Sequence, residues 1–144
     1  MKLLLLTLGI FVTTVTWETD FLKAKETAKS SNKLILLNFS GSDWCGPCIR
    51  MHKEIFDHPS FVEYASSNLI LLRADFPRLK KNRLTDEQQA KNDQLAEVYN
   101  KEGKFPLTVL LSAEGKVLKK WEGFPNLSAT DFVQDIKAQI HAGN

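Results

Sequence analysis

The only two cysteines of this 144-residue chain, Cys45 and Cys48, are separated by two residues. A disulfide across so small a loop would stabilise the fold poorly, because the stabilising effect grows with the length of the closed loop. Two other uses of the pair remain: half of a metal site, or a dithiol that is oxidised and reduced during a reaction. The residues around the pair distinguish between these uses.

Cys45 follows a nearly continuous apolar run, residues 34–39, which is typical of a strand covered on both faces. The residues after it have helical spacing, so Cys45 is expected at a helix N-terminus, where free backbone N–H groups and a partial positive charge favour a thiolate. Pro47 suits the first helical turn, where its missing N–H would have no acceptor. Cys48 lies one turn further on, placed to attack a mixed disulfide formed at Cys45.

A metal site would need further ligands, because a closed zinc site takes four nitrogen or sulfur ligands. His52 comes four residues after Cys48, whereas His58 and His141 are remote in the sequence. This ligand set is incomplete, so we expect no metal.

Hydrophobic periodicity and turn residues predict the order helix, strand, helix, strand, helix, hairpin, helix. The expected helices are one capped by Asp20 and ended by residues 30–32, one from Cys45 to about His58, one from Thr85 to about Tyr99, and one capped by Ser128. The expected strands are residues 34–39, 69–75, 107–111 and 117–121. The long connection between the first two strands predicts a parallel pair. We therefore expect an α/β fold, a central mixed β-sheet with helices on both faces.

Helical spacing also predicts which side chains face the core. They are Phe21, Leu22, Ala24 and Ala28 in the first helix, Ile49, His52, Ile55 and Phe56 in the second, Leu95, Val98 and Tyr99 in the third, and Phe132, Ile136 and Ile140 in the fourth. The first half of the third helix is almost entirely polar and is expected to project into solvent.

Composition indicates one ordinary globular domain, with 43% hydrophobic and 25% charged residues. The formal net charge of +2 arises from 19 basic and 17 acidic residues, too even a balance to indicate nucleic-acid binding. We expect a monomer without a nucleic-acid partner.

The N-terminus has the pattern of a secretory signal, with Lys2 followed by an apolar run over residues 3–12. The run is too short to span a bilayer comfortably, since a spanning helix needs about 20 apolar residues. Thr14 and Thr16 are the small residues before the expected cleavage. We therefore expect a signal peptide over residues 1–16 and a mature domain over residues 17–144, with an uncleaved anchor or a buried strand as the alternatives.

The segment Trp44-Cys45-Gly46-Pro47-Cys48, between a buried strand and a helix, resembles the active site of thioredoxins. The order of elements from Trp17 onward is similar to the thioredoxin fold. The preceding residues, from Phe39, resemble those of exported bacterial thioredoxin-like proteins, which implies a periplasmic location. The resemblance implies that Cys45 and Cys48 are catalytic and form a redox-active disulfide, with no other cofactor. It assigns substrate binding to Trp44, Gly46, Pro47, Phe105 and Pro106.

Phe105 and Pro106 stand directly before the hairpin, where thioredoxins place a cis-proline. The backbone of Phe105 would then pair with an extended substrate peptide as an added strand does. A trans-proline at the start of a strand is the alternative. Residues 121–124 resemble the later thioredoxin loop that contributes to the apolar substrate surface.

Four features depart from the thioredoxin pattern. Asn38 replaces the usual buried aspartate, and Leu71 is assigned to the position of a nearby lysine. Leu107 follows the proline in place of threonine. An asparagine cannot relay a proton as a carboxylate does, so proton transfer at the site would use water or another group. Asp43 and Glu54 are the candidate substitutes.

The fourth departure is a longer basic segment, residues 78–83, expected as a solvated loop or as a docking site for an acidic partner.

The resemblance implies a thiol–disulfide oxidoreductase that acts on disulfide-containing proteins. The Gly-Pro pair between the cysteines is similar to that of reducing thioredoxins, so we expect a reductase. An exported reductase needs electrons from across the membrane, which implies a membrane-embedded dithiol donor. A disulfide oxidase or isomerase, and a non-catalytic binding module that retains the fold, are the alternatives.

Overall fold

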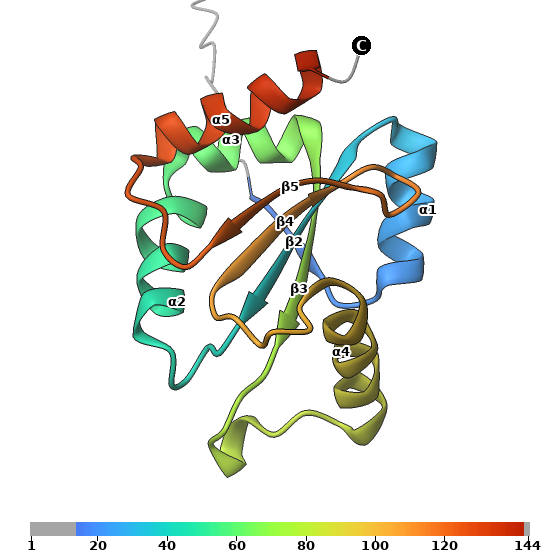
Figure 1. Ribbon diagram of the computed structural model, residues 1–144, viewed down its shortest axis with the longest axis vertical. Coiled ribbons are helices and arrows are strands. Elements are labelled where there is room, and N and C mark those ends of the chain that lie inside the picture. Colours follow the sequence, from blue (N-terminus) through green and yellow to red (C-terminus); the bar gives the residue numbers. More distant parts are fainter. Residues whose placement is uncertain (1–13, 143–144) are drawn as a thin grey trace, which may run out of the picture.

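A five-stranded mixed β-sheet forms the centre of the computed structural model, which describes residues 14–142 (Figure 1). The strands are β1 (Trp17–Glu18), β2 (Leu34–Ser40), β3 (Leu69–Asp75), β4 (Leu107–Leu111) and β5 (Val117–Glu122). Their order across the sheet is β1-β3-β2-β4-β5. β2 is parallel to β3 and antiparallel to β4, and β4 forms an antiparallel hairpin with β5. The predicted parallel pair and hairpin are confirmed, whereas β1 is an addition to the prediction.

Helices cover both faces of this sheet. On one face lie α1 (Phe21–Ser31) and α4 (Asp86–Tyr99). On the other lie α2 (Gly46–Met51), α3 (Pro59–Asn68) and α5 (Ala129–Ala142), with η1 (His52–Phe56), a π-helical turn that continues α2. A single 3₁₀ turn, η2 (Lys80–Asn82), lies between β3 and α4. The predicted α/β architecture is confirmed.

Three predicted helix starts are confirmed by their caps. A side-chain oxygen of Asp20, Thr85 or Ser128 accepts a hydrogen bond of 3.1 Å from the backbone N–H three residues later. Each cap satisfies one N–H group that has no acceptor within its helix.

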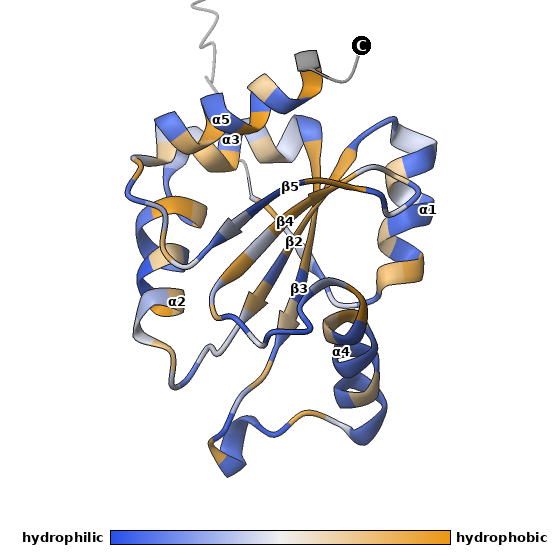
Figure 2. Ribbon diagram, viewed as in Figure 1, coloured by the Kyte–Doolittle hydropathy of each residue, from blue (hydrophilic) through white to orange (hydrophobic). Residues whose placement is uncertain are grey.

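β2 contributes to a hydrophobic core on each side of the sheet, because successive side chains of a strand point to opposite faces. Ile35, Leu37 and Phe39 pack with α1 and α4, whereas Leu36 packs with α2, η1, α3 and α5. Burial on both faces explains the continuous apolar run, and Figure 2 shows the central strands as mostly hydrophobic. β2 ends where the segment carrying the cysteines begins, so both cores hold that segment in place.

Four apolar side chains predicted to face the core are substantially exposed: Leu22 (67%), Ile49 (48%), Val98 (65%) and Ile140 (40%). Each residue of an α-helix turns the chain by about 100°. Ala24 and Ala28 mark the buried side of α1, so Leu22, two residues before Ala24, points away from it. In α2, Cys48 and Met51 mark the buried side, and the side chain of Ile49 between them points to solvent. The apolar faces predicted for these helices were therefore too broad.

The prediction also places no helix between residue 58 and β3, whereas α3 occupies this stretch. His58 caps α3, since its Nδ1 accepts a hydrogen bond of 3.2 Å from Ser60 N. Pro59 is the first residue of α3, a position that proline suits. It therefore begins a new helix after η1.

The polar first half of α4 is mostly exposed or half-buried, as predicted, except for Asn92. Asn92 is buried, and its Nδ2 donates a hydrogen bond of 2.8 Å to Asp75 O.

The predicted signal peptide lies, apart from residues 14–16, outside the described residues. Between residues 14 and 142, no helix is long and apolar enough to cross a membrane.

Phe132 of α5 tests the core on the face of α2. Its ring is fully buried and contacts the rings of Phe56, Phe61 and Trp121. We expect Phe132→Ala to lower the free energy of unfolding by about 3–5 kcal/mol in urea denaturation. Ile140→Ala on the same helix is the control and should cost about 1 kcal/mol or less. Equal losses for the two variants would contradict this description of the core.

Candidate active site

Cys45 and Cys48 are joined by a disulfide at the start of α2, with their Cα atoms 5.2 Å apart. Cys45 is the N-cap of α2, and its Sγ accepts a hydrogen bond of 3.3 Å from Cys48 N. The predicted position of Cys45 at a helix N-terminus is therefore confirmed. Both cysteines are about 95% buried, whereas Gly46 and Pro47 between them are exposed. The disulfide is thus almost entirely buried, whereas the two residues between its cysteines are exposed.

Trp44 and Phe105 bring the cysteine segment and the segment before β4 together. Their rings meet edge to face with centroids 5.5 Å apart. The indole Nε1 of Trp44 donates a hydrogen bond of 2.7 Å to Phe76 O, and the Phe76 ring also contacts Phe105. The Phe105–Pro106 peptide bond is cis. The residues to which the sequence assigns substrate binding therefore come from two segments that pack against each other.

Gly41 is a site residue that sequence reasoning missed. It is buried, and a Cβ atom at this position would overlap the indole ring of Trp44. Its carbonyl oxygen accepts hydrogen bonds from Trp44 N at 3.2 Å and Cys45 N at 2.9 Å. Glycine is therefore required for the indole to lie over this turn. The position of Gly41 in the turn before the cysteines is the feature of the sequence that could have indicated its role.

Residues 121–124, predicted to lie near the site, contact it at two points. Gly123 N donates a hydrogen bond of 2.8 Å to Pro106 O. The guanidinium of Arg50, a residue of α2, lies over the ring of Phe124, 4.1 Å from the ring centroid. The loop after β5 thus joins the cis-proline segment to α2.

Asn38 is buried, and its amide is engaged within the sheet. Its Nδ2 donates a hydrogen bond of 3.1 Å to Thr108 Oγ1, and the Thr108 hydroxyl approaches Met51 Sδ at 3.7 Å. The β2–β3 register pairs Asn38 with Arg73, whereas Leu71 pairs with Leu36 in the core. The β3 residue opposite Asn38 is therefore Arg73, two residues after Leu71.

The two carboxylates suggested as substitutes for the missing aspartate have other partners. Glu54 forms an ion pair of 2.8 Å with Arg50 on the exposed side of the helix. Asp43 accepts hydrogen bonds from Arg78 N at 2.9 Å, Leu79 N at 3.0 Å and Asn82 Nδ2 at 2.9 Å. These bonds, that from Arg78 N first, hold the pKa of Asp43 below its usual value. Asp43 therefore fastens a loop and is poorly suited to exchange protons with the cysteines.

His52 is engaged with charged neighbours. Its Nδ1 lies 2.9 Å from Arg73 Nη2, and its Nε2 lies 3.5 Å from Asp57 Oδ1. The Arg73 guanidinium in turn stacks on Trp17, 4.2 Å from the ring centroid. Burial, and next the charge of Arg73, lower the pKa of His52. Among the side chains that the structure describes, residues 14–140, no three His, Cys, Asp or Glu form a group suited to a metal ion.

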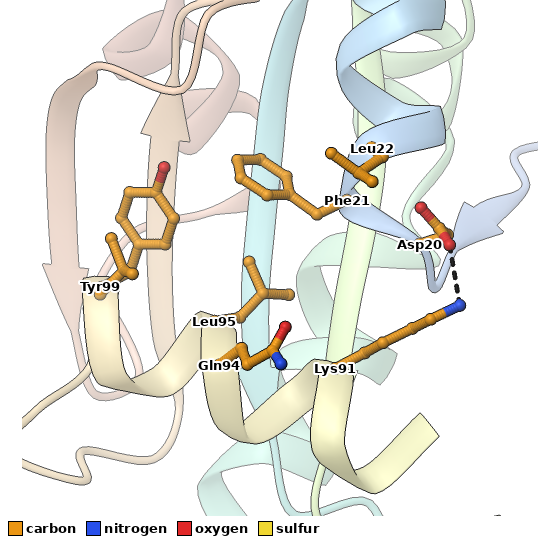
Figure 3. A pocket seen from close by; sticks show the side chains of 8 residues that line it. Asp20, Phe21, Leu22, Lys91, Gln94, Leu95 and Tyr99 are labelled. Carbon is orange, nitrogen blue, oxygen red and sulfur yellow. Dashed lines mark hydrogen bonds and ion pairs between the residues drawn. The ribbon is translucent and has the colours of Figure 1, made fainter. Parts of the chain in front are cut away.

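A separate hollow lies on the other face of the sheet, between α1 and α4 (Figure 3). Phe21, Leu22, Leu95 and Tyr99 give it an apolar lining, and the Asp20–Lys91 ion pair of 2.9 Å closes one side. It contains none of the predicted site residues.

Comparisons with known proteins identify relatives along most of the chain. A family model described as thioredoxin-like matches residues 16–113. Over 124 residues the chain is 36% identical to the disulfide bond reductase DsbH of Chlamydia pneumoniae, covering 86% of this chain and 72% of that protein. It is also 27% identical over 112 residues to the thioredoxin-related protein DsbJ of the same organism, covering 78% of this chain and 31% of that protein.

Solved structures agree with these matches. A DsbH oxidoreductase superposes with a TM-score of 0.82 at 34% identity, covering 98% of this chain and 94% of that chain. A thioredoxin from Thermus thermophilus superposes with a TM-score of 0.63 at 12% identity, covering 88% and 87% of the two chains, a likeness of fold alone. The architecture is therefore the thioredoxin fold.

The lowered pKa of His52 predicts a pH dependence of stability. Below the ordinary value of 6.5, the unfolded chain takes up a proton at His52 that the native state binds less readily. The free energy of unfolding should therefore fall between pH 7.5 and 5.5, a range above the usual titration of carboxylates. Urea denaturation across this range should show a smaller fall for His52→Gln than for the unchanged protein.

Lys53→Gln, on the same helical turn and exposed, is the control and should keep the full pH dependence. An unchanged pH dependence in His52→Gln would rule out this role for His52.

Proposed function

The chain belongs to the thioredoxin-like family and is a thiol–disulfide oxidoreductase, and we propose that it works as a reductase of disulfides in exported proteins. The observation that carries the proposal is the Cys45–Cys48 disulfide at the N-terminus of α2, beside Trp44 and the cis-proline segment. This arrangement provides a nucleophile, a second thiol within reach of it, and an adjoining surface for a substrate chain.

In the proposed reaction, the reduced protein begins as a dithiol and the Cys45 thiolate attacks one sulfur of a substrate disulfide. A mixed disulfide forms, and the other substrate sulfur leaves as a thiolate that takes up a proton. Cys48 then attacks the Cys45 sulfur and displaces the second substrate thiol. Two electrons have passed to the substrate, which is now a dithiol, and Cys45–Cys48 has become a disulfide.

The helix N-terminus supports the choice of Cys45 as the attacking thiol. Cys48 N already donates a hydrogen bond to Cys45 Sγ, and free N–H groups in the first turn favour a negative charge on this sulfur. A lower thiol pKa gives more thiolate at neutral pH. Cys48 lies within α2 and is placed to resolve the mixed disulfide.

Asn38 sets a condition on the proton transfers. Its buried amide has no proton to exchange at neutral pH, and its Nδ2 is engaged with Thr108. Asp43 and Glu54 are bound elsewhere. We propose that the proton of Cys48 passes to solvent near the exposed residues Gly46 and Pro47.

Substrate binding is proposed for Trp44, Gly46, Pro47, Phe105 and Pro106. Gly46 and Pro47 are exposed beside the disulfide, and Trp44 and Phe105 form the neighbouring apolar wall. The backbone of Phe105 would pair with an extended segment of the substrate.

Two observations support reduction as the direction. The Gly-Pro pair resembles that of reducing thioredoxins, and the relative of 36% identity is a disulfide bond reductase. The apolar run at residues 3–12 supports export. We propose that a membrane-embedded dithiol protein then regenerates the reduced form, because an exported reductase needs electrons from across the membrane.

Variants of the two cysteines test the proposed roles. With insulin as substrate and dithiothreitol as electron donor, Cys45→Ser should reduce the rate to that of dithiothreitol alone. Cys48→Ala should accumulate a mixed disulfide through Cys45, visible by mass spectrometry without reductant. Ser67→Ala, an exposed position on α3, should retain full activity.

Full activity in Cys45→Ser, or trapping by Cys45→Ala in place of Cys48→Ala, would overturn the assignment. A protein without activity would favour the binding-module alternative. In native membranes, the Cys48→Ala protein should capture the dithiol donor, and capture of soluble proteins alone would count against that donor.

A further inference from the structure

The loop between β3 and α4 carries a concentration of positive charge beside the active site. Arg78, Lys80, Lys81 and Arg83 lie within six residues and are all exposed. In Figure 1 the loop projects from the same end of the molecule as the start of α2, and Figure 2 shows it as largely hydrophilic. We call residues 76–85 the basic loop.

Asp43 fastens the basic loop to the turn that carries the cysteines. Its two carboxylate oxygens accept two backbone N–H bonds and one side-chain bond from residues 78, 79 and 82. Asp43 stands two residues before Cys45. A second connection joins the same turn to the end of β3, where both oxygens of Asp75 accept hydrogen bonds from Ser42. The position of the basic loop relative to the disulfide is therefore set by several hydrogen bonds.

Arg78 lies directly on the substrate-binding wall of the proposed function. Its guanidinium stacks over the Trp44 indole, 3.6 Å from the ring centroid, and Trp44 contacts Phe105. Stacking of a guanidinium on an aromatic face is favourable and leaves its N–H groups free to bind a carboxylate.

Most of this positive charge is not paired within the part of the chain that the structure describes. Between residues 14 and 142, Arg83 has one exposed ion pair of 3.7 Å with Asp86, and no carboxylate lies within 4.0 Å of the charged groups of Arg78, Lys80 or Lys81. The nearby Asp43 is occupied by the hydrogen bonds that fasten the loop. The loop thus presents cations that an external anion can meet.

We propose that the basic loop docks an acidic segment of the substrate protein next to the disulfide that Cys45 attacks. This inference rests on the proposed function, which brings a protein chain to this end of the molecule. A protein partner is favoured because Arg78 extends the apolar wall formed by Trp44 and Phe105, so one ligand would meet aromatic side chains and cations together. The expected partner carries Asp or Glu residues within a few positions of its disulfide.

The charges should act mainly on the rate of encounter. Individual ion pairs at a surface add little affinity, whereas a field of one sign near a site raises association rates by about 10- to 1000-fold. Salt reduces this effect, because the screening length falls from about 30 Å at 0.01 M to about 3 Å at 1 M.

The test uses the reduced protein and three peptides that contain the same disulfide, flanked by glutamates, by lysines or by uncharged residues. Stopped-flow measurement gives the second-order rate constant for the reaction of the protein with each peptide. Each constant is divided by the rate constant for the same peptide with dithiothreitol, which corrects for differences in the intrinsic reactivity of the peptide disulfides. The glutamate peptide should react about tenfold faster than the lysine peptide in 20 mM salt, and the ratio should approach one in 0.5 M salt.

Two double variants locate the effect. Lys80→Glu/Lys81→Glu changes the basic loop, and Lys29→Glu/Lys116→Glu changes exposed lysines at the opposite end of the sheet, with the same change in net charge. The loop variant should lose or reverse the preference for glutamate, whereas the control should keep most of it. All three proteins should reduce the uncharged peptide at similar rates.

Equal rates for the charged peptides, or equal effects of the two variants, would overturn the docking role. Binding of anionic vesicles through Lys80 and Lys81 without any peptide preference would also overturn it and identify a membrane surface. If even the uncharged peptide is not reduced, the proposed function fails, which is a different result.

Discussion

The position of the Trp44 indole is the constraint on which the rest of the site depends. The ring lies over Gly41, where a Cβ would overlap it, and its Nε1 is hydrogen-bonded to Phe76 O. It contacts Phe105, next to the cis peptide bond, and Arg78 stacks on it. Two segments distant in sequence, residues 76–78 and Phe105, therefore meet on one side chain immediately before Cys45. The buried strand β2 leads into this segment and fixes its position, because alternate side chains of β2 pack in the two cores.

The contacts of Trp44 place the reactive Cys45 next to the residues that we propose select the substrate protein. The start of α2 favours a thiolate at Cys45, and Trp44 and Phe105 beside it form the aromatic wall that we propose as the surface for the substrate chain. Arg78 extends this wall toward the basic loop, which Asp43 keeps at a fixed place. In place of a buried carboxylate, Asn38 joins β2 to Thr108 by a neutral hydrogen bond. We therefore propose that the helix N-terminus sets the reactivity, that solvent exchanges the protons, and that the basic loop selects the partner.

The sequence predicted the elements whose signals are local. The apolar runs of β2 and β3, the caps Asp20 and Thr85, and the position of Cys45 at a helix start all follow from neighbouring residues. β1 is two residues long and too short for a periodic pattern. The contacts of Asp43 with residues 78–82, and the place of Arg73 opposite Asn38, join residues about 35 apart and arise from tertiary packing. Such contacts leave no spacing pattern to read.

The reduction potential of the Cys45–Cys48 couple would distinguish a reductase from a donor of disulfides. The protein would be equilibrated in buffers of graded thiol–disulfide ratio, and the fraction of disulfide measured in each. A reductase requires a potential near that of reducing thioredoxins, about −270 mV, and this is the predicted result. A value near about −120 mV, typical of strong oxidants, would contradict the account and make the protein a donor of disulfides.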